Sequence, residues 1–313
     1  QSVKEHKNKW TTWHWSTKYS INPYNINFTV GHFELIERIV PSLGKPLRVQ
    51  FYVLNENLEG AQKLLDQVEI FVEFFTRNFG QFPWIEEKLG LVNTPYFGME
   101  HQTMIAYGND YKKNEKGYDF LLFHEMAHEW WGNYLSVSDW SDFWIHEGFA
   151  VYCEALYIEE KYGYEEYNSF LTKNISKKIP LSKPIVLERN STMSQVFGLD
   201  PYYKGAFVLH MLRYLVGDES FFKILKDLLH SKKHLPNNQI TTSDFIDIVH
   251  NEIGTNIDWF FKVYLYENQY PVINQKTTHG SNHTFVELSW ENSDFSMPVE
   301  VFYKSNIGFT KKK

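Results

Sequence analysis

Two histidines four residues apart are the feature that most constrains the fold of this chain. They lie in the segment FHEMAHEWWGN at 123–133. On an α-helix, residues at i and i+4 lie on the same face, so His124 and His128 can present both imidazoles to one point. Glu125 sits one position round the helix, where its carboxylate can hold a water instead of binding the same ion. The segment is therefore predicted to be helical and to offer two ligands to a metal ion.

The H-E-x-x-H pattern is typical of zinc hydrolases, but a buried helix can carry the same residues for other reasons. In a chain with 13 histidines, the pattern arises by chance with a likelihood on the order of a few per cent. The flanking Leu121, Leu122, Trp130 and Trp131 also suit a buried helix. The motif alone therefore indicates a metal site. A third ligand is needed to distinguish a metal site from a buried helix with the same residues.

A catalytic zinc ion needs three protein ligands and one open position. Glu147 follows His128 after eighteen intervening residues, in WIHEGFAVYCEAL, at the start of the next predicted helix. Because Glu125 is assigned as the base, Glu147 is the expected third ligand, although the helix dipole alone would also favour a carboxylate there. Glu154, two turns further on the same face, is either support behind the ligand or a solvated glutamate. One Zn²⁺ per chain is expected.

The periodicity of the chain changes along its length. Alternating β-branched and aromatic residues predict strands over 10–54, and helical spacing follows over 59–79. Short strands are expected at LGLVNT and at GMEHQTMIAYG. Further helices are predicted at 118–134, 147–162, 202–217, 219–230, 242–253 and 256–267. Alternation then returns at 284–290 and at MPVEVFY, so the order is strands, a mixed region, helices and strands.

Composition excludes several classes of partner. A net charge of -7 and a pI of about 6.0 argue against nucleic acid or an anionic membrane surface. No apolar stretch approaches the roughly 20 residues of a membrane span, so no membrane contact is evident. Cys153 is the only cysteine, and its setting AVYCEAL predicts a small buried thiol. The compartment stays unknown on these grounds, with a periplasmic or extracytoplasmic location slightly favoured over a cytoplasmic one.

The motifs together resemble a known family. H-E-x-x-H, eighteen residues and the glutamate of EGFA are similar to the aminopeptidase N and leukotriene hydrolase group of gluzincins. GMEH at 98–101 resembles its G-x-M-E-N, and PYYKGAFVLHML at 201–212 resembles its Y-x-K-G-A segment. These matches run in the family's order along nearly the whole chain. The resemblance implies an α+β fold with a thermolysin-like catalytic domain, in which a small mixed sheet packs with a helical lobe.

The resemblance also implies a domain organisation. Residues 1–44 are expected to be the C-terminal strands of an N-terminal β domain, 45–271 the zinc catalytic domain, and 272–313 the start of a β-sandwich domain. Partial β structure from neighbouring domains would then flank the catalytic domain. The missing flanking domains of a longer chain would be its partners within the same polypeptide.

Each motif residue takes a role by resemblance. The two histidines of H-E-x-x-H and Glu147 would bind Zn²⁺, which polarises a carbonyl and acidifies water. Glu125 would take the proton of the attacking water and pass it to the leaving amine. Tyr202 would donate a hydrogen bond to the tetrahedral oxyanion. The adjacent Tyr203 is the alternative, but the spacing to Lys204 favours Tyr202.

Glu100 is expected to select the substrate end. In the family this glutamate receives the free α-amine, so only the first residue is released. Gly98, Met99 and His101 of the same motif are expected to contact the substrate. His101 and His146 stand where the family has asparagines. His101 is expected to contact substrate backbone or to shift the pH profile, and His146 is not expected to compete for the metal.

The sequence therefore predicts a zinc metalloaminopeptidase acting on peptides with a free N-terminus. One alternative is an endo-acting or bifunctional zinc hydrolase, since leukotriene hydrolase shares these motifs. The other is a non-catalytic scaffold of the same fold that has lost its metal. The intact set of ligand, base and anchor residues argues against the scaffold. Cleavage of aminoacyl-anilides but not of N-acetylated analogues would separate exo from endo action.

Overall fold

The computed structural model describes residues 2–230, 238–281, 283–305 and 308–312. These residues form two compact units. The first comprises the chain up to Ser136 together with Asn238, and the second comprises the other described residues from Val137 onwards. Within these described ranges, no helix is both long and apolar enough to cross a membrane.

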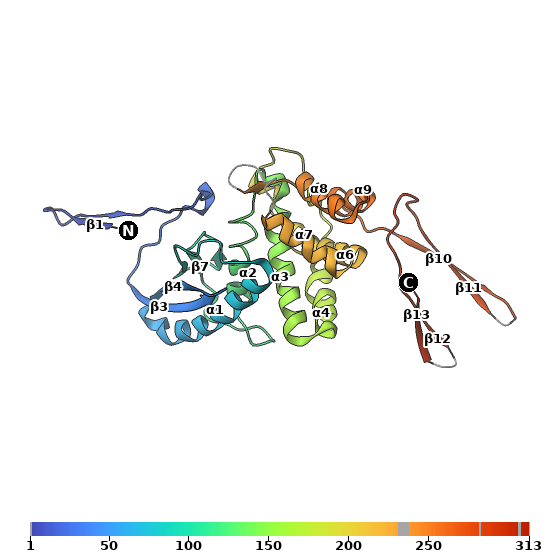
Figure 1. Cartoon of the computed structure of the whole chain (residues 1–313), viewed down its shortest axis with the longest axis horizontal. Coiled ribbons are helices and arrows are strands. Elements are labelled where there is room, and N and C mark those ends of the chain that lie inside the picture. The colour runs from blue at the N-terminus through green and yellow to red at the C-terminus, as the bar shows by residue number, and fades with distance from the viewer. Residues whose placement is uncertain (1, 231–237, 282, 306–307, 313) are drawn as a thin grey trace. The chain divides into compact units, whose positions relative to one another are not determined.

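A mixed five-stranded sheet is the frame of the first unit (Figure 1). Its strands are β3 (Phe33–Ser42), β4 (Lys45–Leu54), β5 (Leu89–Asn93), β6 (Gly98–Met99) and β7 (Ile105–Tyr107). The strand order is β3-β4-β5-β7-β6. β4, β5 and β7 run parallel, whereas β3 and β6 are antiparallel to their neighbours. β6 is therefore an edge strand of this sheet.

Two helices pack on the sheet. They are α1 (Leu58–Phe79) and α2 (Phe120–Ala127). α1 contacts β3 and β4, and α2 contacts β6, β7 and α1. Aromatic rings fill the space beside both helices: the Phe75 ring centroid lies 4.8 Å from that of Phe123 and 5.2 Å from that of Trp130. Because such rings bury large apolar areas in specific geometries, these contacts hold α2 firmly in place.

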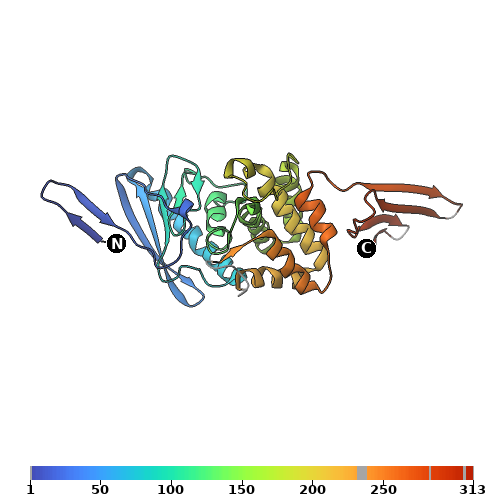
Figure 2. The same cartoon turned by 90° about the horizontal axis from the view of Figure 1, so that it is seen from above.

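Helices dominate the second unit, and several run side by side in Figure 2. They are α3 (Trp144–Tyr162), α4 (Tyr164–Phe170), α5 (Met193–Val196), α6 (Gly205–Val216), α7 (Asp218–His230), α8 (Thr242–Ile253) and α9 (Asp258–Phe261). α3 contacts α4 and α6, and α7 contacts α8. A Cβ added to Gly148 on α3 would lie 2.8 Å from the Cα of Gly205 on α6. Glycine at both positions allows the two backbones to approach this closely.

The remaining elements are short helical turns, a small sheet and three antiparallel hairpins. The turns are η1 (Pro23–Asn25), η2 (Asn55–Asn57), η3 (Trp140–Asp142), η4 (Leu171–Ile175), η5 (Ser176–Lys178), η6 (Asp200–Lys204) and η7 (Lys262–Tyr266). β8 (Ser136–Val137) pairs with β9 (Gln239–Ile240). The hairpins are β1 (Ser2–Glu5) with β2 (Thr11–His14), β10 (Ile273–His279) with β11 (Thr284–Trp290), and β12 (Val301–Ser305) with β13 (Gly308–Lys312).

Most predicted elements are confirmed, and the α+β class with a mixed sheet and a helical lobe is among them. The helix expected at 59–79 is α1, and the strand expected at LGLVNT is β5. The expectation of one strand across GMEHQTMIAYG is wrong, because a turn with Thr103 at a φ of 60° divides it into β6 and β7. The division of the chain into 1–44, 45–271 and 272–313 stays a prediction.

The helix predicted at 118–134 is shorter than expected and ends at Ala127. Beyond it the amides of Asn133, Tyr134 and Leu135 donate to carbonyls five residues earlier, and Gly132 has a φ of 135°. Apolar residues continue at helical spacing through this turn because Trp130 and Trp131 are buried there. Periodicity therefore could not reveal the end of the helix.

Candidate active site

A buried carboxylate starts the helix that carries the first motif. Asp119 caps α2, because its Oδ1 accepts a hydrogen bond of 3.0 Å from the Leu122 amide. Its Oδ2 accepts one of 2.5 Å from the Tyr107 hydroxyl, and its own amide donates to Gln67 over 2.7 Å. Burial raises the pKa of Asp119, and these donors oppose that rise. The start of α2 is thereby tied to β7 and α1.

The two histidines of the motif face each other. The Nε2 atoms of His124 and His128 are 3.1 Å apart, and their rings are nearly perpendicular at 89°. His128 Nδ1 lies 2.9 Å from the carbonyl oxygen of Trp131, so an Nδ1–H can donate there, which places the lone pair of the neutral ring on Nε2. Two nitrogens bound at ~2.05 Å to a tetrahedral zinc ion are separated by about 3.3 Å. The pair therefore fits two ligands of one zinc ion.

Glu125 lies against the edge strand β6. Its side chain is buried, with only 5% of its area exposed. A Cβ added to Gly98 on β6 would lie 2.7 Å from Glu125 Oε1 and 2.7 Å from Leu121 Cδ1. Only glycine fits at this crossing without displacing the carboxylate. Met99, the other residue of β6, is half-buried.

Glu100 follows β6 and is buried beside the motif. Its Oε1 accepts a hydrogen bond of 3.2 Å from the Tyr24 hydroxyl, and its backbone carbonyl accepts one of 2.8 Å from Asn133 Nδ2. Glu100, Glu125 and His128 form a group in which one ligand-capable atom of each lies within 4.8 Å of the others. The first unit therefore brings the predicted anchor, the predicted base and a predicted ligand together.

His101 lies half-buried next to Glu100. Its Nε2 is 3.0 Å from Asn27 Nδ2. Burial lowers the pKa of His101, and the negative charge of Glu100 opposes this shift. An asparagine amide facing the ring favours the neutral imidazole, in which Nε2 accepts the hydrogen bond.

Glu129 fastens the turn that follows α2. It is fully buried and accepts hydrogen bonds of 2.7 Å from Trp84 Nε1, 3.0 Å from the Thr103 amide and 3.3 Å from Asn133 Nδ2. Burial raises the pKa of Glu129 to about 7, and its three donors oppose the shift. Asn133 donates to both Glu129 and Glu100, so it connects this turn to the predicted anchor.

The other predicted metal residues belong to α3, in the second unit. Glu147 lies in the first turn of α3 and is 4% exposed, and Glu154 is half-buried two turns later. His146 is fully buried, and its Nε2 accepts a hydrogen bond of 3.1 Å from the Val137 amide. That backbone bond occupies the lone pair that a metal would need, and the expectation that His146 does not compete for the metal stays a prediction.

The two candidate tyrosines have different surroundings. Tyr202 lies in η6, with its ring edge-on to Phe143 at 6.2 Å and to Phe197 at 6.3 Å. Tyr203 is engaged by a lysine: Lys178 Nζ lies 4.9 Å from its ring centroid and 3.4 Å from its hydroxyl. Aromatic packing orients Tyr202, whereas a cation holds Tyr203.

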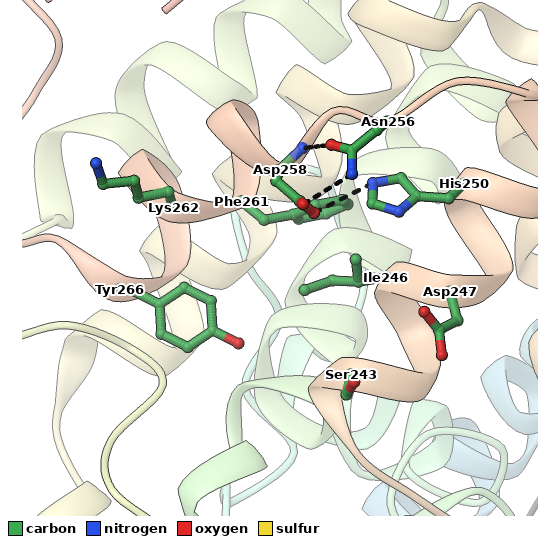
Figure 3. Close-up of a pocket in the computed structure, with 9 residues that line it drawn as sticks. All are labelled: Ser243, Ile246, Asp247, His250, Asn256, Asp258, Phe261, Lys262 and Tyr266. Carbon is green, nitrogen blue, oxygen red and sulfur yellow. Dashed lines mark hydrogen bonds and ion pairs between the residues drawn. The ribbon is translucent and has the colours of Figure 1, made fainter. Parts of the chain in front are cut away.

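A separate hollow of about 470 Å³ opens between α8 and the helical turns α9 and η7 (Figure 3). None of the predicted site residues lines it. Its polar groups already contact one another: Asn256 Nδ2 donates to Asp258 over 2.8 Å, and His250 Nε2 lies 3.6 Å from the same carboxylate. His250 Nε2 also accepts a hydrogen bond from the Ile257 amide. The hollow thus contains none of the hydrolytic groups.

The sequence did not reveal a polar segment that contacts Glu100, the predicted amine anchor. Tyr24 donates to Glu100, Asn25 Nδ2 donates to Asn133 Oδ1 over 2.7 Å, and Asn27 contacts His101. These three residues lie in the range 10–54 where strands were predicted, and that prediction is wrong here, because the chain between β2 and β3 forms only the turn η1 and irregular structure. The cluster of asparagines around NPYNIN was the one signal available, because short polar side chains often form specific local hydrogen bonds.

The sequence matches a known protein family. The model of the family described as "Peptidase family M1 domain" matches residues 65–264. The chain belongs to peptidase family M1. The match covers most of α1, the strands β5, β6 and β7, the H-E-x-x-H helix and the helices up to α9. The family resemblance expected from the motifs is confirmed.

Curated relatives are aminopeptidases. Endoplasmic reticulum aminopeptidase 1 of Rattus norvegicus is 24% identical over 253 residues, covering 74% of this chain and 27% of that protein. Glutamyl aminopeptidase of Sus scrofa is 25% identical over 285 residues, covering 85% of this chain and 30% of that protein. Aminopeptidase M1-B of Oryza sativa subsp. japonica is 27% identical over 280 residues, covering 82% and 31%. The chain thus spans less than a third of the length of these relatives.

Solved structures share the fold. An M1 zinc metallopeptidase mutant from Deinococcus radiodurans, bound to a Tyr-Ser-Ala substrate, superposes with a TM-score of 0.67 at 19% identity, covering 87% of this chain and 60% of that chain. Legionella pneumophila aminopeptidase A, in complex with aspartic acid, gives a TM-score of 0.71 at 15% identity, covering 87% and 32%. At these identities the likeness establishes the fold.

Proposed function

We propose that this chain is the catalytic part of a zinc-dependent aminopeptidase, which hydrolyses the first peptide bond of peptides. The observation that carries the proposal is the group of Glu100, Glu125 and His128, whose ligand-capable atoms lie within 4.8 Å of one another. An amine anchor this close to the base and the metal ligand leaves room for about one residue, because one residue spans at most ~3.6 Å of extended chain.

Zinc would be held by His124, His128 and Glu147. The 3.1 Å separation of the two histidine Nε2 atoms supports the assignment of these two ligands. Two neutral imidazoles and one carboxylate are a typical donor set for a catalytic zinc with one open position. When bound, Zn²⁺ supplies Lewis acidity, which polarises a carbonyl and acidifies water. The names of the Deinococcus neighbour and of the family's zinc peptidases support this assignment.

Glu125 would be the proton carrier. Its carboxylate takes a proton from the attacking water and delivers it to the nitrogen of the leaving amine as the peptide bond breaks. Its burial beneath Gly98 holds the oxygen atoms in position through both transfers. Tyr202 would donate its hydroxyl proton in a hydrogen bond to the oxyanion that forms at the scissile carbonyl. The engagement of Tyr203 with Lys178 supports the choice of Tyr202.

Glu100 would confine cleavage to the first residue. An ammonium group pairs with its buried carboxylate through a charge-assisted hydrogen bond, which a blocked N-terminus cannot make. A buried carboxylate left without its partner disfavours such substrates further. His101 and Met99 flank the anchor and would contact the same end of the substrate. Gly98 would bring the backbone of β6 close to the scissile bond. Glu154 would support Glu147 from behind.

Glu125→Gln tests the proposal. The variant should bind about one equivalent of zinc and lose at least about a hundredfold in kcat on leucyl-anilide, since general base catalysis contributes 10²–10⁴-fold. Glu165→Ala is the matched control, because Glu165 is an exposed carboxylate on α4. Turnover of Glu125→Gln near that of the control would refute the base assignment, even if zinc is bound.

The partners would be peptides with a free N-terminus and the remaining domains of a longer chain. The Deinococcus structure holds a tripeptide substrate, which supports the peptide class. One relative is named for the endoplasmic reticulum, which supports an extracytoplasmic location. Fractionation of the producing cells would test the location, and recovery with cytosolic markers would contradict it.

A further inference from the structure

A strained turn follows the predicted amine anchor. Glu100 comes directly after β6, and the chain then turns back into the antiparallel β7, with the Met104 amide donating to the His101 carbonyl over 2.8 Å. Thr103 in this turn has a φ of 60°. A β-branched residue rarely adopts a positive φ, because its side chain crowds the backbone there. Contacts from outside the turn therefore have to hold it in this conformation.

Two ionisable side chains hold the backbone of Thr103. Lys88 Nζ donates a hydrogen bond of 2.5 Å to its carbonyl oxygen. Glu129 Oε1 accepts one of 3.0 Å from its amide. The bond from the lysine ammonium is charge-assisted and therefore stronger than a bond between neutral groups. Both backbone polar groups of the strained residue are thus paired.

The approach of the lysine to the turn depends on Gly90. Lys88 comes just before β5 and is half-buried, and Gly90 lies within that strand. A Cβ added to Gly90 would lie 2.3 Å from the Thr103 carbonyl oxygen and 2.7 Å from Lys88 Nζ. Any larger residue would push the ammonium away from the carbonyl. Burial lowers the pKa of Lys88 to about 8, and the negative charge of Glu129 opposes this shift. The fold therefore encloses this cation against the turn.

The other end of the segment is also fastened. Asn133 Nδ2 donates to the Glu100 carbonyl over 2.8 Å and to Glu129 Oε2 over 3.3 Å. The chain from Glu100 to Thr103 is therefore held at both ends. Lys88 holds the Thr103 end, and its hydrogen bond involves no residue of α2. Loss of that bond should loosen the anchor without removing a hydrogen bond of the metal-binding helix.

We infer that Lys88 is a positioning residue for the amine anchor: by holding the strained turn at Thr103, it fixes the position of the Glu100 carboxylate. This inference rests on the proposed function, in which Glu100 receives the free amine of the substrate. Lys88 has no contact with the substrate or the metal in that function. Its effect should therefore appear in the affinity for free amines, and it should depend on the strain at Thr103.

Lys88→Met tests the inference, because methionine keeps an unbranched side chain and cannot donate a hydrogen bond. For the zinc-loaded variant, KM on leucyl-anilide should rise about fivefold to tenfold, while kcat should stay within about twofold of the wild type. Lys63→Met is the matched control and should leave KM unchanged, because Lys63 lies on α1 with 67% of its side chain exposed. All three proteins should bind about one equivalent of zinc.

A second substitution tests the dependence on strain. Glycine adopts a positive φ about as readily as a negative one, so Thr103→Gly should favour the turn even without the lysine. The double variant, Lys88→Met with Thr103→Gly, should return KM to within about threefold of the wild type. A merely structural role of Lys88 would lower the urea midpoint of unfolding and give no such recovery in KM.

A binding measurement separates the anchor from the chemistry. In the Glu125→Gln background, leucinamide is compared by calorimetry with its analogue that lacks the α-amine. Addition of Lys88→Met should weaken leucinamide about fivefold or more and should leave the analogue unchanged. Hydrogen exchange of the segment 98–107 should be faster in Lys88→Met than in Lys63→Met, since the turn is released.

Equal KM values for Lys88→Met and Lys63→Met would overturn the inference, and so would a double variant as weak as Lys88→Met alone. Equal weakening of leucinamide and its analogue would do the same, because Lys88 would then not act through the amine. If the zinc-loaded wild type leaves leucyl-anilide intact while leucinamide binding still depends on Lys88, the hydrolytic function is wrong and the positioning role stands. If neither turnover nor amine-selective binding is found, both are rejected.

Discussion

Tyr24 donates its phenolic hydrogen to Oε1 of Glu100 over 3.2 Å. The two residues are 76 positions apart, and Tyr24 belongs to the short turn η1, which precedes every strand of the five-stranded sheet. Directly after Tyr24 in the chain, Asn25 and Asn27 make hydrogen bonds to Asn133 and His101. A segment outside the sheet therefore orients the carboxylate that we propose as the amine anchor.

Tyr24→Phe should weaken substrates that have a free amine. The carboxylate loses a donor that fixes its rotamer, and loss of a hydrogen bond to a charged group costs about 1.5 kcal/mol or more, or roughly tenfold in KM. The value of kcat should change little, since the base and the oxyanion donor are untouched. Steady-state kinetics on leucyl-anilide measure both constants. Tyr164→Phe is the control, because Tyr164 is 62% exposed on α4. A loss confined to kcat would contradict the positioning role.

Gly148→Ala should destabilise the second unit. The new methyl carbon would lie 2.8 Å from the Cα of Gly205, a backbone atom that cannot move without shifting α6 against α3. Overpacking of this kind costs about 1–3 kcal/mol of unfolding free energy. Urea denaturation followed by circular dichroism measures the loss. Lys226→Ala, at an exposed position of α7, should be neutral within about 0.5 kcal/mol. Equal midpoints for the two variants would show that α3 and α6 tolerate separation.

Acid should weaken the second unit through His210. Burial lowers the pKa of this imidazole to about 4, and the positive charge of Arg213 adds to the shift. Its Nδ1 lies 2.8 Å from the Tyr167 hydroxyl. The unfolded chain takes up a proton below pH 6.5 and the folded chain only near pH 4, so stability falls as pH decreases between these values. The contribution is up to about 3 kcal/mol.

His210→Asn isolates this contribution, because it keeps a polar partner for Tyr167 and removes the titrating ring. Urea unfolding at pH 6.5 and at pH 4.5 should show a smaller loss of stability for the variant than for the wild type. The difference between the two losses cancels other groups that titrate in the same range. An identical loss in both proteins would mean that His210 does not resist protonation in the folded state.

Tyr202→Phe should lower kcat more than it raises KM. The proposed hydrogen bond to the oxyanion forms in the transition state, and removal of one such donor costs about 10²–10³-fold in kcat. Tyr203→Phe should remain within a few-fold of the wild type, because Lys178 holds that hydroxyl. The same leucyl-anilide assay gives both values. If Tyr203→Phe is the slower variant, the oxyanion donor is the neighbouring residue.

Periodic elements and spaced motifs could be predicted from the sequence. The apolar positions of α1 repeat at helical spacing because one face of that helix is buried on the sheet, and Gly80 follows its end with a φ of 97°. The register of His124, Glu125 and His128 follows from helical geometry alone. The need for glycine at position 98 is visible only in the structure, because Glu125, which lies against Gly98, belongs to another element.

The contacts that complete the site depend on tertiary structure. Nothing in local spacing connects Tyr24 to Glu100, or Trp84 to Glu129, because each pair joins segments that are far apart in sequence. The end of α2 was hidden because buried tryptophans continue the helical pattern into a turn.

The central claim is that zinc held by the H-E-x-x-H helix and Glu147 makes this chain an aminopeptidase. The most direct measurement is a titration of metal-free protein with Zn²⁺, while hydrolysis of leucyl-anilide and of its N-acetyl analogue is followed. We predict that leucyl-anilide hydrolysis rises to a plateau at about one equivalent of zinc and that the acetylated substrate stays intact. Equal cleavage of the two substrates, or no hydrolysis of either at saturating zinc, would contradict the account.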